Sequence, residues 1–448
     1  MLSSEIGKII GRGRNVYVVG IKGAGVAGLA QILKAKGFEI TGSDTKDRFF
    51  TDAILKRARI PYFEGFSRDN VVNAFSRHRP IRANGPMRKI NWALVSNAYL
   101  MDPVTNPEIL ELRRQKIPIL SYPEALSHFF NESFGIAIAG THGKTSVASA
   151  LAFILDHAGL NPNALIGGEV LNWNSNAIVS APSVASAKEG QKNIFVLEAD
   201  EYKDAFLNYR PDIAVVLNTD WDHPDYFKSH ADYKKSFKKF TQSVKPGGKV
   251  FTAKDFAKTP GKIETPLIGE HNQFNLRAAW IVARYLGVPE RTIRDALKKF
   301  KGTRRRLETV GRLGTSILID DYAHNPQKVA ASLQALKKHY PKKKIIVVFQ
   351  PHTYSRTEAF LGDFAKVLLL ADETHLLDIY ASAREVKGTV TSDDIVLEVQ
   401  RLGKNAVNLR TVENAAEFFK KNPPKNAVLA AMGAGNVGDL AHILAREK

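Results

Sequence analysis

The sequence predicts an α/β protein with parallel sheets, and three observations support this prediction. Short runs rich in β-branched residues alternate with stretches of helical periodicity, a pattern typical of parallel sheets covered by helices. The chain has 448 residues, and the strand–helix pattern restarts near residues 16, 136 and 314. At roughly 150 residues per domain, this length fits about three domains. We therefore expect three domains, at residues 1–131, 132–310 and 311–448.

The clearest strand signals are short apolar runs that each precede a helical stretch. We expect strands at residues 16–19 in the first domain, at 136–139, 194–197 and 213–217 in the second, and at 317–319, 345–349 and 427–431 in the third. The small, polar segment 181–192 is predicted to be a surface loop. No internal repeat of roughly 20–50 residues is present, so a solenoid or propeller is not expected.

The composition excludes several classes of protein. Hydrophobic residues make up 44% and charged residues 24% of the chain, which is ordinary for a globular protein and unlike a disordered one. Because cysteine is absent, disulfides, thiolate metal sites and cysteine nucleophiles are excluded. No apolar run approaches the roughly 18 residues of a membrane helix, and the first residues do not resemble a signal peptide. We therefore expect a soluble, cytoplasmic protein without a membrane partner.

The net charge is high, because 64 Lys and Arg residues against 45 Asp and Glu residues give +19. This excess favours either nucleic-acid binding through release of counterions, or a basic solvated surface with polyanionic ligands. The basic clusters at residues 234–239, 298–306 and 337–344 have helical or turn spacing. No helix-turn-helix, zinc-finger or RNA-binding sheet motif is present. We expect solvated helix faces and no nucleic-acid partner.

A glycine-rich run follows the first expected strand. Gly23, Gly25 and Gly28 satisfy the pattern G-x-G-x-x-G between that strand and a helix. Glycines at this spacing let backbone amides approach a diphosphate at the helix N-terminus. Asp44, at the end of a second strand, is placed to bind a ribose hydroxyl. The pattern predicts a site for NAD or another nucleoside diphosphate; the alternative is a turn that only packs helix against strand.

A second glycine loop opens the expected second domain. Residues 140–145 read GTHGKT after a strand and resemble a phosphate loop, although Ile138 stands where the usual pattern has its first glycine. In such a loop the backbone amides hold phosphates, Lys144 reaches the terminal phosphates, and the Thr145 hydroxyl binds magnesium. The sequence therefore predicts a nucleotide phosphate site here.

Acidic residues end two later strands of the same domain. Glu198, Asp200 and Glu201 follow one strand, and Asp222 with His223 follows another. Strand ends of an open α/β sheet face the ligand crevice, and magnesium prefers carboxylate oxygens. Glu198 fits a magnesium ligand, whereas the residue type of His223 leaves its role open. Asp200 or Glu201 has the alternative role of capping the next helix.

Three polar turns end strands of the expected third domain. They read DDYAHNP at residues 320–326, QPHTYSRT at 350–357 and GAGN at 433–436. Together they offer carboxylates for an ammonium group, an arginine for a carboxylate or phosphate, and histidines for proton transfer. The turns form either a binding edge or ordinary helix caps.

Seven motifs in a fixed order point to a family. They are GTHGKT (140–145), EADE (198–201), DHPDY (222–226), EHNQFN (270–275), GTRRR (302–306), DDYAHNP (320–326) and QPHTYSRT (350–357). With these motifs the chain resembles, over nearly its whole length, the Mur ligases, ATP-dependent amino-acid ligases of peptidoglycan precursor synthesis. Within the family it is most similar to members that join L-alanine to UDP-N-acetylmuramate, because GIKGAG stands at 20–25 and DDYAH is paired with QPHTYSRT.

The resemblance implies a Rossmann-like first domain that binds UDP-N-acetylmuramate, a central ATPase domain with a mainly parallel sheet, and a Rossmann-like third domain that brings L-alanine. The first glycine loop would then hold the UDP diphosphate rather than NAD. In the implied reaction, which uses ATP and Mg²⁺, the lactyl carboxylate takes the γ-phosphate and L-alanine then displaces phosphate. The implied role is in cell-wall biogenesis, cell shape and cell division, as a monomer or homodimer.

The resemblance also assigns roles to single residues. For the UDP-sugar it implies Gly23, Ala24, Gly25, Ser43, Asp44, Ser96 and Asn97. For ATP it implies Gly140, Thr141, His142, Gly143, Lys144, Thr145 and Ser146, with His271, Asn272 and Asn275 at the adenine. For magnesium it implies Thr145, Glu198 and His223, and for L-alanine Tyr322, His352 and Arg356. As catalytic residues it implies Lys144, Asp321, His324 and either Arg305 or Arg306.

Departures from the family pattern concentrate in the first domain, at Phe66, Tyr122 and the basic stretch 76–89. EADEY and RRRLE also resemble the ligase that attaches a recovered L-alanyl-γ-D-glutamyl-diaminopimelate tripeptide to UDP-N-acetylmuramate, which is the main alternative. An NAD-dependent oxidoreductase is a distant alternative that leaves GTHGKT and Glu198 unexplained. A nucleic-acid-stimulated ATPase is supported by the net charge alone.

Overall fold

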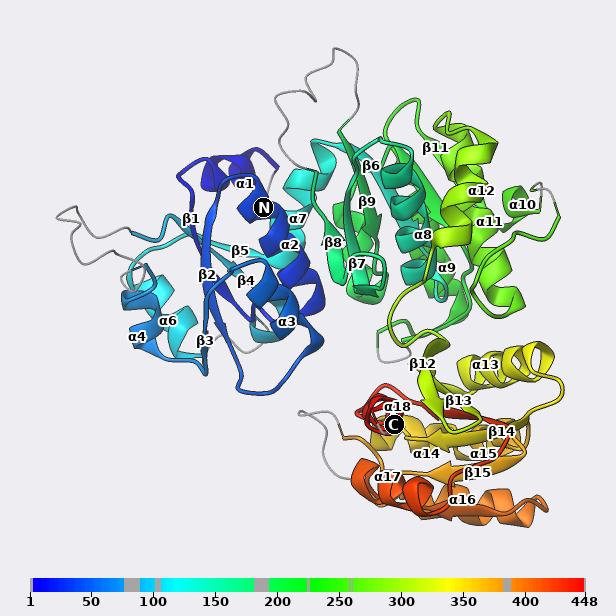
Figure 1. The fold of residues 1–448 in the computed structure, drawn as a ribbon. Coiled ribbons are helices and arrows are strands. Elements are labelled where there is room, and N and C mark those ends of the chain that lie inside the picture. Colours follow the sequence, from blue (N-terminus) through cyan, green and yellow to red (C-terminus); the bar gives the residue numbers. More distant parts are fainter. Residues whose placement is uncertain are drawn as a thin grey trace. The chain divides into compact units, whose positions relative to one another are not determined.

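The computed structural model describes residues 3–75, 89–100, 106–180, 193–223, 226–257, 259, 261–381 and 388–446. They form two compact units, Met1–Thr265 with Asn275–Phe300 and Pro266–Phe274 with Lys301–Lys448. The units contain three sheets, each mainly parallel and packed against helices (Figure 1). The α/β prediction is therefore confirmed, and each of the seven predicted runs lies in a strand, except that the run 213–217 extends one residue beyond its strand. The predicted boundaries at 131 and 310 stay predictions, and the predicted loop 181–192 lies outside the described residues.

The first sheet has five parallel strands in the order β3-β2-β1-β4-β5. Its strands are β1 (Asn15–Val19), β2 (Glu39–Asp44), β3 (Tyr62–Glu64), β4 (Trp92–Val95) and β5 (Ile119–Ser121). The helices of this part are α1 (Ser3–Ile10), α2 (Ala24–Ala35), α3 (Phe50–Arg57), α4 (Arg68–Val72), α5 (Asn97–Leu100), α6 (Pro107–Arg114) and α7 (Tyr122–Asn131). The strand order reverses between β1 and β4, and open α/β sheets bind ligands at such a point.

The second sheet belongs to the same unit and has the order β11-β10-β6-β9-β7-β8, with only β8 antiparallel to its neighbour. Its strands are β6 (Phe134–Ala139), β7 (Asn163–Val170), β8 (Ser175–Ile178), β9 (Ile194–Glu198), β10 (Ile213–Val216) and β11 (Lys249–Thr252). The helices are α8 (Lys144–His157), the 3₁₀ helix η1 (Tyr202–Asn208), α9 (His230–Gln242), α10 (Ala253–Phe256), α11 (Glu270–Tyr285), whose first five residues belong to the second unit, and α12 (Glu290–Lys299). Because β6 lies between β9 and β10, the loops after these three parallel strands meet at one edge.

Helix α2 joins the first two sheets into one unit, since it packs against both of them (Figure 1). Asn176 on β8 donates from Nδ2 to Ala24 O at 2.6 Å, and Gln31 Nε2 donates to Asn176 Oδ1 at 3.2 Å. A Cβ on Gly28 would lie 3.2 Å from Leu165 Cγ. The third glycine of the first loop motif therefore serves the packing of α2 on the second sheet.

The third sheet lies in the second unit and has the order β12-β13-β17-β14-β15-β16, with β12 antiparallel to β13. Its strands are β12 (Glu308–Leu313), β13 (Ser316–Asp321), β14 (Lys344–Phe349), β15 (Glu373–Leu376), β16 (Ala406–Asn408) and β17 (Ala427–Met432). The helices are α13 (Pro326–His339), α14 (Tyr354–Ala359), α15 (Leu361–Leu368), α16 (Ser392–Arg401), α17 (Val412–Lys421) and α18 (Gly438–Ala445). Apolar clusters cover both faces of this sheet, as expected for parallel strands.

The described helices are short, with at most 16 residues. In the part of the chain that the structure describes, none has the length and hydropathy needed to cross a membrane. The longest, α11, has 16 residues and carries charged side chains at both ends.

Candidate active site

The predicted phosphate loop connects β6 to α8. Gly140 and Gly143 have φ angles of 144° and 86°, which favour glycine. A Cβ on Gly143 would lie 2.4 Å from Asn275 Oδ1. Asn218, just after β10, holds the loop because its Oδ1 accepts from His142 N at 2.9 Å and its Nδ2 donates to His142 O at 3.1 Å. These contacts fix the loop and place the N-terminus of α8, where anions bind, at the sheet edge.

Lys144 is the first residue of α8, and its side chain folds back over the loop. Its Nζ donates to Gly140 O at 2.6 Å and to Glu201 Oε2 at 2.7 Å. Burial opposes the charge on Lys144, but the carboxylates of Glu201 and Asp200 outweigh it and raise the pKa of Lys144. Burial also opposes the charge on Glu201, yet His223 and Lys144 hold the pKa of Glu201 at about 2. Lys144 and Glu201 are therefore both charged at neutral pH.

Thr145 and Glu198, two residues predicted to bind magnesium, are in direct contact. Thr145 Oγ1 donates to Glu198 Oε1 at 2.8 Å, and Gly167 N donates to Glu198 Oε2 at 2.7 Å. A Cβ on Gly167 would lie only 2.8 Å from Glu198 Oε2, so glycine is needed for this approach. The ends of β6 and β9 thus bring a hydroxyl and a carboxylate together beside the phosphate loop.

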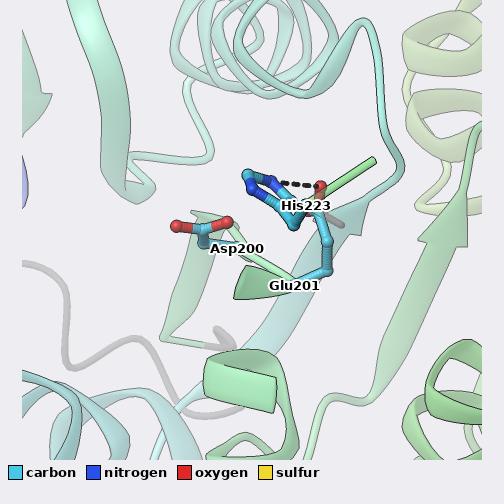
Figure 2. Close-up of side chains that lie close together, drawn as sticks. All are labelled: Asp200, Glu201 and His223. Atoms are coloured by element: carbon cyan, nitrogen blue, oxygen red, sulfur yellow. Dashed lines mark ion pairs between the residues drawn. The ribbon is translucent and has the colours of Figure 1, made fainter. Parts of the chain in front are cut away.

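Asp200, Glu201 and His223 form a second group of possible ligands, shown in Figure 2. Their ligand atoms all lie within 4.8 Å of one another, and His223 Nε2 is 3.7 Å from Glu201 Oε1. His223 has a left-handed φ of 57°, and its ring centroid lies 4.8 Å from that of Tyr202. Asp200 accepts from Tyr202 N at 3.1 Å, whereas Glu201 is the N-cap residue of η1 but makes no side-chain capping hydrogen bond and bonds to Lys144.

The donor set of this edge fits a magnesium ion. Magnesium takes oxygen ligands, usually one or two carboxylates together with substrate phosphates. Glu198 and Thr145 offer such oxygens next to Lys144, and the Asp200–Glu201–His223 group adds two carboxylates and one imidazole. A divalent cation beside a nucleotide phosphate would therefore find suitable ligands among the described residues.

Tyr233 on α9 also belongs to this site, although the sequence did not point to it. Its buried hydroxyl donates to Glu201 Oε1 at 3.0 Å and lies 2.9 Å from Thr141 Oγ1. Thr141 Oγ1 in turn donates to Asp220 O at 2.5 Å. The spacing of Tyr233 with Phe237 predicts only the buried face of a helix, so no local signal marks its hydroxyl as part of the site.

The stretch predicted to contact adenine is divided between the two units. Asn275 belongs to the first unit and lies against Gly143, whereas His271 and Asn272 belong to the second. Asn272 Nδ2 donates to Ile268 O at 2.8 Å. Burial lowers the pKa of His271, which favours its neutral form.

The residues predicted for the UDP-sugar gather at the edge of the first sheet. Gly20 N donates to Ser43 O and Ser96 N donates to Val19 O, each at 2.9 Å, so the ends of β1, β2 and β4 meet. Gly23 is the N-cap of α2, which places Ala24 and Gly25 in its first turn. Asn97 begins α5 at the same edge.

Asp44, predicted near the ribose, is already hydrogen-bonded within the protein. Its carboxylate accepts from Lys22 N at 2.6 Å, from Thr45 N at 2.8 Å and from Tyr99 Oη at 3.1 Å. A ribose hydroxyl would have to share these oxygens. At the same edge the Tyr122 hydroxyl rests on the glycine loop, since a Cβ on Gly25 would lie 2.4 Å from it.

Asp321, at the end of β13, holds two turns of the second unit. Its Oδ2 accepts from Leu307 N at 3.0 Å and its Oδ1 accepts from Ala323 N at 2.7 Å. Its carboxylate therefore fixes the backbone next to Arg306 on one side and next to His324 on the other.

The two arginines between which the sequence could not choose differ in their contacts. Arg305 Nη2 donates to Gly433 O at 2.6 Å, and its Nε donates to Asp320 Oδ1 at 3.3 Å. Among the described residues, no hydrogen bond or ion pair holds the guanidinium of Arg306, which lies 5.7 Å from the Tyr322 ring centroid. Of the pair, Arg306 thus has the guanidinium that is still available to an anionic ligand.

The residues predicted to receive the amino acid also lie together in the second unit. The His324 ring centroid is 5.1 Å from that of Tyr322 and 6.2 Å from that of His352. Arg356 Nη1 is 3.2 Å from His352 Nδ1. Burial, helped by Lys328, lowers the pKa of His324 to about 3, so its imidazole is neutral at pH 7.

A phosphate loop with a partly buried lysine, next to carboxylates at the carboxyl edge of a parallel sheet, is typical of nucleotide-binding α/β proteins. Three family models match the chain in series: "Mur ligase family, catalytic domain" at residues 15–134, "Mur ligase middle domain" at 138–259, and "Mur ligase, glutamate ligase domain" at 305–435. The chain belongs to the Mur ligase family. It is therefore a ligase, and membership of the family implies that it uses ATP.

Relatives and solved structures agree with this assignment. A UDP-N-acetylmuramate–L-alanine ligase of Desulfitobacterium hafniense (strain Y51) is 30% identical and covers 94% of this chain and 97% of its own. One of Carboxydothermus hydrogenoformans is 31% identical over 96% of both chains. The structure of the UDP-N-acetylmuramate–alanine ligase of Thermotoga maritima has a TM-score of 0.75 at 23% identity, over 96% of this chain and 98% of that one. A murein peptide ligase of Psychrobacter arcticus has a TM-score of 0.66 at 20% identity, over 97% and 100%.

Proposed function

We propose that the chain joins L-alanine to the lactyl carboxylate of UDP-N-acetylmuramate in an ATP-dependent step of peptidoglycan precursor synthesis. Relatives that carry this name match the chain over nearly its full length, which supports the substrates. The structural observation that carries the proposal is the ion pair of Lys144 with the buried Glu201, beside the Thr145–Glu198 contact. It supplies a phosphate-binding cation and metal-binding oxygens at one strand edge.

The proposed reaction has two steps because a carboxylate is a poor acyl donor. In the first, an oxygen of the lactyl carboxylate bonds to the γ-phosphorus of ATP and ADP leaves, which gives an acyl phosphate. In the second, the neutral amine nitrogen of L-alanine bonds to the acyl carbon, phosphate leaves from the tetrahedral intermediate, and the nitrogen loses one proton and keeps the other as the amide N–H. Both reactants of the first step are anionic, so catalysis depends on positioning and on compensating charge.

In the first unit, Lys144 supplies that charge at the phosphate loop, and the loop residues 140–146 hold the phosphates. Thr145, Glu198 and His223 would hold Mg²⁺, which when bound neutralises phosphate charge. The UDP diphosphate lies at the N-terminus of α2 against Gly23, Ala24 and Gly25 in this proposal. Ser43, Asp44, Ser96 and Asn97 line the remainder of that site. Asn275 contacts the adenine, together with His271 and Asn272.

In the second unit, Arg306 is the arginine that we assign to the transferred phosphate, because Arg305 is held by Asp320 and Gly433. Arg356 carries a guanidinium that suits the carboxylate of L-alanine, with Tyr322 and His352 beside it. Neutral His324 can accept a hydrogen bond from the incoming amine without repelling it. Asp321 acts by positioning Arg306 and His324.

The proposal includes three domains at residues 1–131, 132–310 and 311–448, a cytoplasmic location, a monomer or homodimer, and no nucleic-acid partner. The domain bounds, the location and the lack of a nucleic-acid partner are inferred from the sequence, and the oligomeric state only from the family resemblance.

The test is phosphate release from MgATP with UDP-N-acetylmuramate, screened with L-alanine, L-serine, glycine and the L-alanyl-γ-D-glutamyl-diaminopimelate tripeptide. Release that requires both the sugar nucleotide and L-alanine is the expected result. Release with the tripeptide alone would select the tripeptide ligase instead. No release with any acceptor would refute the proposed substrates.

A further inference from the structure

Glu201 is a carboxylate enclosed by three different partners. Its side chain is 1% exposed. Oε2 accepts from Lys144 Nζ at 2.7 Å, Oε1 accepts from Tyr233 Oη at 3.0 Å, and His223 Nε2 lies 3.7 Å from Oε1. A buried carboxylate without partners is costly, so these contacts keep Glu201 ionised inside the protein.

The same lysine is needed elsewhere if the proposed function holds. Lys144 must reach the terminal phosphates of ATP, yet here its ammonium is bound to Glu201 and to Gly140 O. Phosphate and the Glu201 carboxylate offer the same kind of anionic oxygen to one ammonium group. Binding of a nucleotide therefore exchanges one anion for another at Lys144.

The exchange leaves Glu201 with fewer partners, and the Tyr233 hydroxyl then becomes its main hydrogen-bond donor. Once Lys144 has turned to a phosphate, the Tyr233 hydroxyl and His223 are the remaining partners of Glu201 among those described above. Tyr233 is fully buried on α9, and its hydroxyl also contacts Thr141 Oγ1 of the phosphate loop at 2.9 Å. Its position is fixed by aromatic neighbours, with ring centroids 4.9 Å from Phe227 and 5.0 Å from Phe237.

We propose that Glu201 is the resting counter-ion of Lys144, which a nucleotide phosphate replaces, and that Tyr233 is the positioning residue that keeps Glu201 paired after the exchange. This inference rests on the proposed function, because it requires ATP to bind at the phosphate loop. It assigns to Tyr233 a role in nucleotide affinity that neither its residue type nor its place on a lysine-rich helix indicates.

The consequence is an effect of Tyr233 that depends on the charge of residue 201. In Tyr233→Phe, release of Lys144 leaves Glu201 short of a donor, so ATP should bind about tenfold more weakly, as for a lost hydrogen bond to a charged group. In Glu201→Gln, Lys144 no longer leaves an anion behind, so ATP without metal should bind more tightly than to the unaltered protein. In the double variant, the Tyr233→Phe substitution should have no further effect, since the amide introduced by Glu201→Gln carries no charge to support.

The experiment is calorimetric titration of ATP, in EDTA and with Mg²⁺, into the full chain, Tyr233→Phe, Glu201→Gln and the double variant. Tyr209→Phe is the matched control, because Tyr209 is buried in the same unit and among the described residues no hydrogen bond joins its hydroxyl to the phosphate loop. Its ATP affinity should equal that of the unaltered chain. Thermal unfolding of all five proteins shows that each is folded before its affinity is compared.

Two results would overturn the inference. Unchanged ATP affinity in Tyr233→Phe means that the hydroxyl does not support the exchange. A loss of equal size whether or not Glu201→Gln is also present means that Tyr233 acts on the loop by packing alone. If the unaltered chain binds no ATP at all, the proposed function itself fails, and the inference fails with it.

Discussion

Two glycine loops of the first unit each contain a lysine, and the two lysines behave in opposite ways. Lys22 stands in GIKGAG after β1, and Lys144 stands in GTHGKT after β6. Lys144 extends over its own loop and meets Glu201, at the strand edge where we propose that a phosphate binds. Lys22 turns away from its loop and is buried at 2% exposure.

The contacts of Lys22 explain this difference. Its Nζ donates to Thr45 O at 3.0 Å and to Asp47 O at 2.9 Å, and it lies 3.2 Å from Asp52 Oδ1. The Tyr62 ring covers it at 5.2 Å, within the range of a cation–π contact. Its ammonium group therefore binds the segment after β2 and stabilises that segment.

The position of each lysine relative to its helix decides its role. Lys144 is the first residue of α8, directly after the left-handed Gly143, so its side chain starts where the helix presents free amides. Lys22 comes before the N-cap Gly23 of α2, in the turn itself. In this chain the candidate phosphate ligand is therefore the lysine that opens its helix, Lys144.

The largest effect is expected for Lys144→Ala. Loss of the ammonium removes the charge that offsets two anionic reactants, so phosphate release should fall about 10²- to 10³-fold or more. The measurement is kcat for phosphate release at saturating substrates. Turnover within a few-fold of the unaltered enzyme would mean that the loop has been assigned the wrong role.

A similar division is expected for the adjacent arginines of the second unit. Arg306→Lys should lower kcat about 100-fold, since it removes the fork that binds the transferred phosphate, and should leave the free energy of unfolding unchanged. Arg305→Lys should instead lower the free energy of unfolding by about 1–2 kcal/mol, because lysine cannot bond both Asp320 and Gly433 O. Steady-state kinetics and urea unfolding of both variants check this, and the reverse pattern would exchange their roles.

Lys22→Met tests the bracing role in the first loop. It keeps the length of the side chain but removes the ammonium, so the free energy of unfolding should fall by about 2 kcal/mol. The KM for the sugar nucleotide should rise while ATP affinity stays unchanged. Lys34→Met is the matched control, because Lys34 also donates to two carbonyls, at Ala58 and Arg59, but from an exposed site. If Lys22→Met instead abolished ATP binding with stability intact, the comparison of the two lysines would be wrong.

The smallest effect is expected for a substitution of His324. Desolvation disfavours the charged form of its imidazole, whereas Lys144 keeps its charge through an ion pair. The pKa of His324 is lowered to about 3, below its unfolded value, so the unfolded chain binds a proton that the folded chain rejects between pH 6.5 and 3. His324 therefore makes the protein less stable as the pH falls through this window. In His324→Gln, stability should depend less steeply on pH from 6.5 to 4, as measured by urea unfolding at several pH values. Parallel pH profiles for the two proteins would contradict a neutral His324 with a lowered pKa.

Much of the fold could be predicted because local patterns of apolar and polar residues indicate it. Apolar runs such as 136–139 and 345–349 are central strands buried on both faces, and they stand out for that reason. The edge strands β3, β5 and β16 have three residues each, too few to show a periodicity. Motif residues at strand ends could be placed at one sheet edge because parallel strands share their direction.

The pairings within the site could not be predicted, because they join residues far apart in the sequence. Tyr233 meets Glu201 across 32 residues, and Asn218 meets His142 across 76. The direction of Lys22, towards Asp47 and Asp52 rather than towards its loop, depends on the segment after β2 and not on the motif. The choice between Arg305 and Arg306 likewise required the position of Gly433, at the end of β17.

The account depends most on the assignment of the two loops to two different ligands. The most direct measurement is calorimetric titration of ATP and of UDP-N-acetylmuramate, separately, into Lys144→Ala, with unfolding curves to establish that the variant is folded. We predict that ATP affinity falls at least about tenfold, as for the loss of one charged hydrogen bond, while UDP-N-acetylmuramate affinity stays the same. An equal loss of both affinities, or a loss for the sugar nucleotide alone, would contradict the account.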